Sequence, residues 1–279
     1  MQVGSTKPAI KRIVRFVTKR LVGNAVPRRY SLDDIRRDQA EFDEWRQLNP
    51  GKPLRDFSVE DMEASLAEGK MHSTLGGTLQ RGSFDRAGVQ FFERLREWGL
   101  TEDDTCVDYG CGTLRVGLHV MKLLRPGRYW GLDIAKCLLD EGQNLVGHEL
   151  LAQKQPHLRV ISGEALAEAA EAKPTFLFST NVMSHVYPEE LPEYFDNIMS
   201  IIGVSGQAII DSYWTDADTI VYGKRCWAHS GPAINKLIAS LDGKIAILRQ
   251  RRQRLPLEGK HYSQRGTFRL AHISNANAF

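Results

Sequence analysis

The sequence predicts an α/β fold in which a mostly parallel β-sheet is covered by helices on both faces. Three observations support this prediction. From residue 105 to residue 272, short apolar segments of strand length alternate with longer segments of helical periodicity. The first apolar segment leads into a turn with Gly110 and Gly112, and then into a helical segment. The chain of 279 residues is 42% hydrophobic and 25% charged, as expected for a globular domain with a buried core.

Caps and turn residues set the limits of the predicted elements. Ser83 is a favourable N-cap for a helix that ends at Gly99, and Pro188 is suited to the first position of another. The predicted strands span 105–109, 128–133, 158–162, 176–180, 207–211, 244–248 and 267–272. The predicted helices span 83–98, 115–124, 164–172, 188–202 and 230–241, with another helical stretch that ends near residue 152.

Residues 1–70 differ in character from residues 71–279, so we divide the chain there. The first eight basic residues all precede Asp33, the first acidic residue, although the chain carries 37 Lys and Arg against 34 Asp and Glu. An enzyme that acts on bulk nucleic acid more often has its positive charge on the body of the domain, which makes a nucleic-acid partner a poor expectation. The first division is predicted to be a basic amphipathic arm followed by a mostly helical extension.

Within the arm, residues 7–22 place apolar side chains at helical spacing with Lys and Arg on the other faces. Such a helix can bind an anionic membrane surface, or can dock its apolar stripe on the body of the protein. An organellar transit peptide is a third interpretation. The membrane interpretation corresponds to a cytoplasmic protein that is peripheral on the inner membrane surface.

The four cysteines, at 106, 111, 137 and 226, show no disulfide spacing and no metal-ligand grouping. No apolar run reaches the ~20 residues that a membrane-spanning helix requires. We therefore expect reduced thiols, no metal site and a cytoplasmic location.

The strongest local signal is the sequence from Val107 to Thr113, which contains Asp108, Gly110 and Gly112. Glycines are suited to a sharp turn over which a ligand approaches the backbone closely. Asp133 ends the next predicted strand, 21 residues after Gly112, where a carboxylate can accept hydrogen bonds from a ribose diol. Either feature alone is common, as an ordinary turn or a helix cap, but together they indicate an adenosine-type cofactor site.

These segments resemble class I S-adenosylmethionine-dependent methyltransferases, which have a seven-stranded Rossmann-like sheet whose last strand is antiparallel. Asp108 to Gly112 resembles the first motif and Gly131 to Ile134 the second. Ser162 to Ala165 resembles the end of the third strand, and Phe178 to Val186 the fourth-strand motif beside the transferred methyl group. The likeness covers roughly residues 71–272, with the motifs in the family's order and at its spacings.

The resemblance implies S-adenosyl-L-methionine as the cofactor and a site in residues 71–279. Asp108 would hold the methionine ammonium group, and Asp133 the ribose hydroxyls. Glu164 would face the adenine edge, and Asn181 would lie near the reactive centre. The complete set of implied cofactor-binding residues is Asp108, Gly110, Cys111, Gly112, Asp133, Ile134, Gly163, Glu164 and Asn181.

One position departs from the family pattern. Leu114 stands where the family usually has a third glycine, two residues after Gly112. A nicotinamide dehydrogenase fits less well, because its motif requires glycine at the position of Arg115 and would leave the fourth-strand likeness unexplained. A non-catalytic cofactor-binding protein of the same fold stays open because of Leu114.

Methyl transfer to oxygen requires a base, and His185 is the first candidate because it follows the fourth strand. A structural histidine is the alternative. Asp211 is the second catalytic candidate, while Tyr213 and Trp214 are candidates for the acceptor pocket. His261 is a weaker base candidate.

The predicted acceptor is a small molecule, a sugar or a glycan precursor, with oxygen as the methylated atom. Four arginines, at 249, 251, 252 and 254, would favour an anionic acceptor if they converge on the pocket, but a solvated charged loop is the preferred explanation. An RNA methyltransferase is the remaining alternative, but the fourth-strand motif is not the Asn/Asp-Pro-Pro-Tyr/Phe type used on exocyclic base amines.

Overall fold

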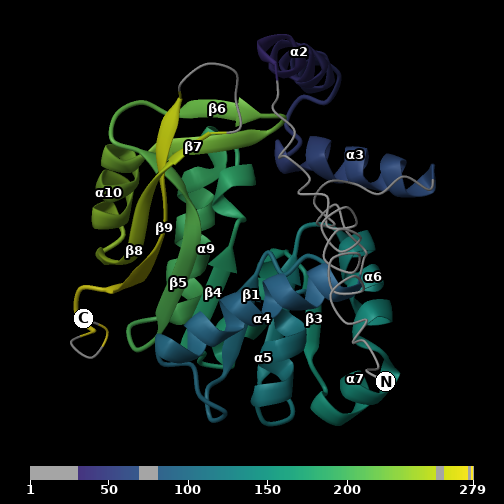
Figure 1. Ribbon diagram of the computed structural model, residues 1–279, viewed down its shortest axis with the longest axis vertical. Helices are drawn as coiled ribbons and strands as arrows, with labels where there is room; N and C mark the ends of the chain where they lie inside the picture. The colour runs from purple at the N-terminus through teal and green to yellow at the C-terminus, as the bar shows by residue number, and fades with distance from the viewer. Residues whose placement is uncertain (1–30, 69–80, 256–260, 276–277, 279) are drawn as a thin grey trace, which may run out of the picture.

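Five parallel strands form the centre of a twisted sheet in the computed structural model, which describes residues 31–68, 81–255, 261–275 and 278. Their order across the sheet is β3, β2, β1, β4, β5 (Figure 1). The bounds are β1 Cys106–Tyr109, β2 Tyr129–Asp133, β3 His157–Val160, β4 Phe176–Thr180 and β5 Gln207–Thr215. The order reverses between β1 and β4, and in doubly wound sheets ligands bind at such a switch point.

Two long strands extend this sheet beyond β5. Strand β9 (Tyr262–His272) runs antiparallel to β5, and β8 (Gly243–Arg254) runs antiparallel to β9. These two strands and the five parallel strands form the predicted seven-stranded sheet, and the prediction of an antiparallel last strand is confirmed. Both strands are longer than predicted. The prediction included only the apolar part of each strand and left out the outer halves, which carry Arg and Gln.

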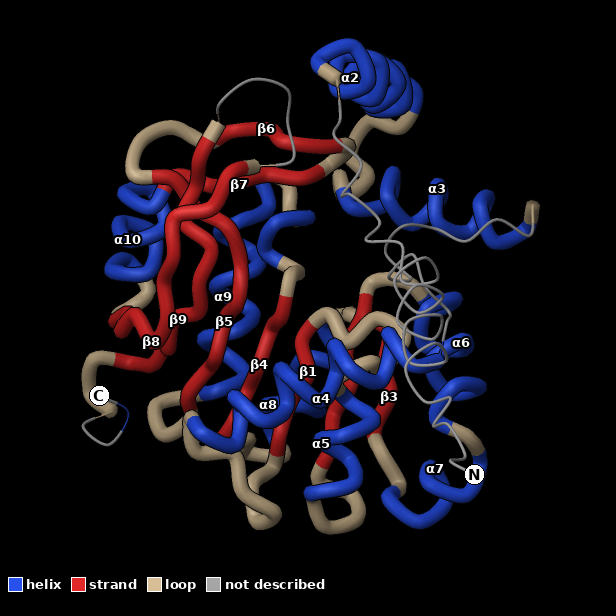
Figure 2. Tube along the Cα trace, in the orientation of Figure 1, coloured by secondary structure: helices blue, strands red, loops and turns tan. Residues whose placement is uncertain are grey.

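The sheet also has an addition that the sequence did not reveal. Strands β6 (Ile220–Gly223) and β7 (Cys226–Ser230) form an antiparallel hairpin, and β7 pairs with the last two residues of β5, Trp214 and Thr215. Within the described residues the sheet thus has nine strands rather than seven. The hairpin lies at the carboxyl end of β5, near the switch point (Figure 2).

Alternating side chains along the central strands face two separate cores. Cys106, Phe176 and Phe178 pack on one face with the apolar sides of α4 and α5, whereas Val107 and Leu177 pack on the other face with α8, α9 and α10. The helices are α4 (Arg81–Glu97), α5 (Gly117–Leu123), α6 (Lys136–Val146), α7 (His148–Lys154), α8 (Gly163–Glu171), α9 (Leu191–Ile202) and α10 (Gly231–Ser240). The predicted helical layers on both faces are confirmed.

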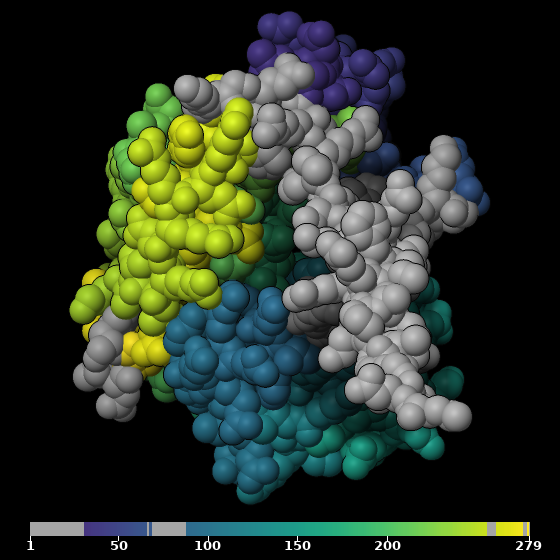
Figure 3. Space-filling model, viewed as in Figure 1, coloured from purple at the N-terminus to yellow at the C-terminus, as the bar shows by residue number. Residues whose placement is uncertain are grey.

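The described part of the extension forms two helices, α2 (Leu32–Leu48) and α3 (Arg55–Ala67). A capping box at Ser31 starts α2, with the Asp34 amide donating to the Ser31 hydroxyl at 3.0 Å. Helix α2 lies beside β6, at the end of the molecule opposite α5 and α7 (Figures 1 and 3). The stretch 7–22, for which the sequence predicts an amphipathic helix, lies outside the described residues.

Aromatic residues join the extension to the rest of the chain. The rings of Phe42 and Tyr187 stack at 4.8 Å, those of Phe42 and Phe57 lie 5.5 Å apart, and Tyr187 in turn contacts Trp227 of β7 at 4.7 Å. Aromatic pairs of this kind contribute about 0.5–1.5 kcal/mol each beyond their buried area. Helices α2 and α3 are therefore packed on the hairpin and on the loop after β4. Among the described helices, none combines the length and the apolar character needed to cross a bilayer.

Candidate functional site

A cavity of about 420 Å³ lies at the carboxyl ends of β1, β2 and β4, where the sequence predicted a cofactor site. The turn after β1 forms its floor, and the ends of β2, β3 and β4 contribute one residue or more each. Helices α3 and α9 and the turn of the β6–β7 hairpin complete the walls. Of the predicted site residues, seven line it: Asp108, Gly110, Cys111, Gly112, Asp133, Ile134 and Asn181; the base candidate His185 does so as well.

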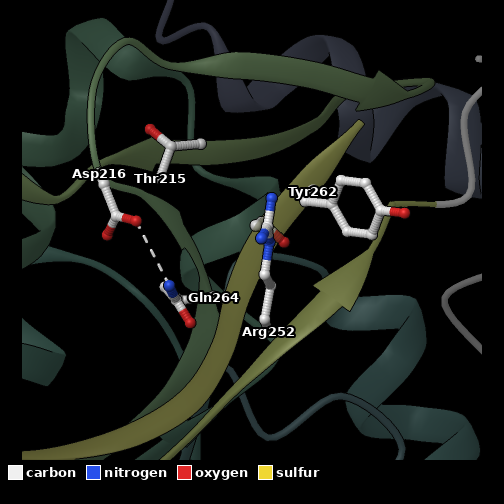
Figure 4. Close-up of a pocket in the computed structure, with 6 residues that line it drawn as sticks. Thr215, Asp216, Arg252, Tyr262 and Gln264 are labelled. Carbon is white, nitrogen blue, oxygen red and sulfur yellow. Dashed lines mark hydrogen bonds between the residues drawn. The ribbon is translucent and has the colours of Figure 1, made fainter. Parts of the chain in front are cut away.

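A second cleft, of about 310 Å³, lies between the end of β5 and strands β8 and β9 (Figure 4). Two pairs of its side chains contact each other. Gln264 donates to Asp216 at 3.3 Å, and the Arg252 guanidinium lies 4.6 Å from the centre of the Tyr262 ring. None of the predicted cofactor-binding residues lies there, so the larger cavity is the candidate site.

The turn after β1 bends back on β2 through two left-handed glycines. The amides of Gly110 and Cys111 both donate to the carbonyl of Leu132, at 2.7 and 3.0 Å. Gly110 has φ of 79° and Gly112 has φ of 53°, a region that glycine adopts without steric cost. A Cβ on Gly110 would lie 2.3 Å from Val182 Cγ2, so the turn also packs tightly against the loop after β4.

Leu114, which departs from the family pattern, has a left-handed backbone conformation. Its φ is 62°, and its side chain is completely buried. Gly142 of α6 makes the space, since a Cβ there would lie 2.9 Å from Leu114 Cγ. The left-handed conformation costs about 1–2 kcal/mol for a residue with a Cβ, whereas truncating a buried leucine costs about 2–5 kcal/mol. Packing therefore outweighs strain at this position.

That balance predicts that both Leu114→Gly and Leu114→Ala destabilise the protein. We expect Leu114→Ala to lower the free energy of unfolding by about 2–5 kcal/mol, because the strain stays while the packing is lost. Leu114→Gly should cost less, by about 1 kcal/mol, because glycine relieves the strain. Chemical denaturation of the three proteins measures the difference, and a Leu114→Gly variant more stable than the parent would contradict it.

Asp133, at the end of β2, holds the turn after β1 in place by a hydrogen bond. Its carboxylate accepts hydrogen bonds from the Gly112 amide at 2.7 Å and from the Ala135 amide at 3.0 Å. The residue is buried but lines the cavity. Burial raises the pKa of Asp133, and the amide donors partly offset this effect. One carboxylate thus connects the turn after β1 to the end of β2 and to the start of α6.

Asp108 is a buried carboxyl group at the bottom of the cavity. The Tyr129 hydroxyl donates to it at 2.8 Å. Burial raises the pKa of Asp108 to about 8, with the nearby Asp133 contributing in the same direction, whereas the Tyr129 hydrogen bond and the Arg115 charge lower it. A cation within hydrogen-bond distance would stabilise the charged form of this carboxyl group.

The end of β3 differs from the expectation. Gly163 and Glu164 begin α8 behind the Ser162 N-cap, the Glu164 side chain is exposed, and neither residue is part of the cavity lining. Ile161 lines the cavity instead. With Ile134, Leu138 and Met62 it forms an apolar wall next to Asp133. After β3 it is thus the apolar Ile161, and not Glu164, that lines the cavity.

Asn181 directly follows β4 and has a left-handed conformation, with φ of 66°. Its amide donates to the Asp211 carbonyl at 2.9 Å, and its side-chain oxygen accepts a hydrogen bond from Arg265 at 2.7 Å. A non-glycine residue held at positive φ beside a cavity is a strained position that the surroundings must enforce. Here the enforcing residue is Arg265 of β9, which sequence reasoning missed.

Asp211 does not lie in the cavity lining, which corrects its prediction as a catalytic residue. Its side chain is buried against β9, where Arg265 donates to one carboxylate oxygen and Thr267 to the other. The cause is the antiparallel pairing of β9, which places Thr267 opposite Asp211. Asp211 is thus the counter-ion of Arg265.

The neighbouring candidates for the acceptor pocket lie elsewhere too. Tyr213 lies beneath the Arg265 guanidinium at 4.5 Å, and Trp214 packs edge-on against Phe268. His261 is exposed between β8 and β9 and is not part of the lining. The four arginines at 249, 251, 252 and 254 are exposed on β8, away from the cavity, so the solvated interpretation holds for them.

His185 reaches the cavity from a 3₁₀ turn that spans Met183–His185. Its Nδ1 lies 3.2 Å from the Arg225 carbonyl oxygen. Because a carbonyl oxygen only accepts, Nδ1 carries the hydrogen in the neutral ring and Nε2 is the nitrogen that can accept a proton. The geometry is compatible with the predicted role as a base.

Two parts of the cavity wall were not predicted as site residues. Helix α3 contributes Arg55, which forms an ion pair with Glu193 of α9 at 2.9 Å. The hairpin contributes Arg225, which pairs with Asp61 of α3 at 2.7 Å and with Asp38 of α2 at 3.3 Å. These contacts close the cavity with elements that are far apart in sequence. Phe42, Trp45 and Phe57, aromatic residues in a charged segment, are the sequence signal for this packing.

No protein-family model matches the chain. Solved structures do resemble it. A SAM-dependent methyltransferase from Anabaena variabilis ATCC 29413 shares 15% identity at a TM-score of 0.55, covering 80% of this chain and 96% of that one. Magnesium protoporphyrin IX methyltransferase (ChlM) from Synechocystis PCC 6803, crystallised with SAM, shares 16% identity at a TM-score of 0.51, covering 80% and 99%.

A third structure is the 1,6-didemethyltoxoflavin-N1-methyltransferase from Burkholderia thailandensis, crystallised with its acceptor and S-adenosylhomocysteine. It shares 14% identity at a TM-score of 0.50 and covers 80% of this chain and 92% of that one. At these identities the likeness shows the fold: the chain has the Rossmann-like fold of class I SAM-dependent methyltransferases.

Proposed function

We propose that this chain binds S-adenosylmethionine in the cavity at the carboxyl ends of β1 and β2 and transfers its methyl group to a small-molecule acceptor. The observation that carries the proposal is the hydrogen bond between Asp133 and the Gly112 amide. It joins the two segments that resemble the first and second family motifs at the wall of one cavity. The similar structures with bound SAM or S-adenosylhomocysteine support the same cofactor.

The residues present fit this cofactor. A Cβ on Gly112 would meet no protein atom within 4 Å, so the backbone there is open to a ligand. Asp133 offers carboxylate oxygens for the ribose hydroxyls, and Asp108 a buried carboxylate for the methionine ammonium group. The apolar wall of Ile134 and Ile161 suits an adenine ring.

The bound cofactor supplies an activated methyl group on a good, neutral leaving group. The contribution of the chain is to align an acceptor with this methyl group and to exclude water. In reactions of this type, such alignment can account for much of the decrease in the activation free energy. Asn181, fixed by Arg265, would shape the wall beside the acceptor. For an oxygen acceptor, Nε2 of His185 would take the proton.

The acceptor is a small molecule in this proposal, with oxygen as the methylated atom. The cavity is the size of a small-molecule site, and residues of α3 and of the hairpin turn form part of its wall. The named acceptors of the similar enzymes, protoporphyrin and a toxoflavin precursor, are also small molecules. Neither the non-catalytic alternative nor the RNA alternative is favoured by an observation of this kind.

The proposal predicts a pH-dependent affinity. Asp108 has a pKa of about 8, so below pH 8 the free protein holds a proton that the cationic ammonium group must displace. Affinity for S-adenosylhomocysteine should therefore fall as the pH falls, by up to about tenfold per unit between pH 7.5 and pH 6. Isothermal titration at several pH values measures this dependence and the proton released.

Asp108→Asn is the matched control, since it keeps the shape of the side chain without a titrating carboxyl. It should bind more weakly at pH 7.5 and should lose most of the pH dependence. Absence of any S-adenosylhomocysteine binding by the folded parent protein would refute the proposed function. Binding that is independent of pH in the parent would refute only the role of Asp108.

A further inference from the structure

Cys226 and His185 face each other on the cavity wall. Sγ of Cys226, the first residue of β7, lies 3.5 Å from Nδ1 of His185, and both residues line the cavity. The thiol is partly exposed, unlike Cys106 and Cys111, which are buried. Cys137 is also partly exposed, but it lies on α6 outside the cavity lining.

A hydrogen-bond donor faces this thiol. Nδ1 of His185, which carries a hydrogen because it also faces the Arg225 carbonyl, lies 3.5 Å from Sγ and can donate a hydrogen bond to the sulfur. Removal of water by the cavity walls lowers the pKa of His185, but Cys226 and the Arg225 carbonyl outweigh this and raise it.

Charged and titratable groups on every adjoining element belong to this environment. Lys224 and Arg225 precede Cys226 in the hairpin turn and carry positive charge. Asp38 and Asp61 compensate Arg225 from α2 and α3. The rings of Tyr213 and Tyr222 pack in the same apolar cluster as Cys226.

We propose that Cys226 is a nucleophilic thiol, activated by His185, that bonds covalently to electron-poor carbon atoms of molecules entering the cavity. The thiol proton is released to solvent, Nδ1–H of His185 donates a hydrogen bond to the resulting thiolate, and the sulfur electron pair forms the new S–C bond. With an alkylating agent, the leaving group departs with the electron pair of the broken bond. The inference rests on the contacts of Cys226 alone and does not require the proposed methyl transfer.

Iodoacetamide tests the inference on the full chain, because it forms an S–C bond to cysteine and releases iodide. At pH 7, Cys226 should be alkylated at least about tenfold faster than Cys137, its internal control. Peptide mass spectrometry at successive times gives the rate at each cysteine. His185→Asn should slow Cys226 by about tenfold and leave Cys137 unchanged, because only Cys226 contacts the ring.

Equal rates at Cys226 and Cys137 in the parent protein would overturn the proposal, and this comparison needs no variant. An unchanged Cys226 rate in His185→Asn would overturn the role of the imidazole. Far-ultraviolet circular dichroism verifies that the variant is folded. Neither readout depends on S-adenosylmethionine, so failure here is distinct from failure of the proposed function.

Discussion

Replacing Asp133 by alanine is expected to weaken the binding of S-adenosylhomocysteine by at least about a hundredfold. The carboxylate accepts from the Gly112 and Ala135 amides, so its loss leaves two amides without their acceptor and frees the turn after β1. It also removes the proposed partner of the ribose. Hydrogen bonds to a charged group contribute about 1.5–3 kcal/mol each, and 1.4 kcal/mol corresponds to a tenfold change in affinity.

Two further variants make the experiment specific. Asp133→Asn keeps one acceptor oxygen and should lose less affinity than Asp133→Ala. Asp140→Ala removes an exposed carboxylate of α6 that forms an ion pair with Lys136 at 2.7 Å, and this variant should bind as the parent does. Calorimetric titration at pH 7.5 measures all three. An Asp133→Ala protein that folds and binds within threefold of the parent would contradict the assignment of this cavity.

The central part of the fold could be predicted because its signals are local. Strand β4 spans Phe176–Thr180, as predicted from its apolar run, and α8 and α9 were located to within a few residues by their caps and periodicity. The hairpin of β6 and β7 was missed because its strands are only four and five residues long. The turn between them carries two charged residues, Lys224 and Arg225. The stability of the hairpin comes from packing on α2, α3 and β5, which no local pattern records.

The same distinction applies to the candidate site. Asp108, Gly112 and Asp133 were found because a glycine turn and a strand-terminal carboxylate have a recognisable spacing. Arg265 could not be found in this way, since it reaches Asn181 only through the antiparallel pairing of β9 with β5. Asp211 was assigned to the wrong role for the same reason: its partner lies 54 residues away in sequence.

Division of the chain at residue 70 separates two charge patterns, but it does not separate the site. Arg55 and Met62 of α3 line the cavity together with residues of the Rossmann-like sheet. Arg225 joins α2, α3 and the hairpin by ion pairs and lies over the Phe57 ring at 5.0 Å. We infer that α3 forms part of the wall of the site and that α2 is joined to the same wall through Arg225.

Gly112→Ala provides the second large effect, with Gly127→Ala as its control. Both glycines have positive φ, 53° and 75°, and a Cβ on either would meet no protein atom within 4 Å. Alanine should therefore cost each variant a similar amount of stability, about 1–2 kcal/mol. Only Gly112 lines the cavity, where the added methyl group would occupy space that the proposal assigns to the cofactor.

We therefore expect Gly112→Ala to lose at least about tenfold in affinity for S-adenosylhomocysteine, or 1.4 kcal/mol, and Gly127→Ala to bind as the parent does. Thermal unfolding without ligand should shift to a similar extent in both variants, which separates backbone strain from the loss of cavity space. Equal affinities in the two variants would mean that no ligand approaches the turn after β1. The cofactor would then have to lie elsewhere, and the resemblance of Asp108 to Gly112 to the first family motif would concern the fold alone.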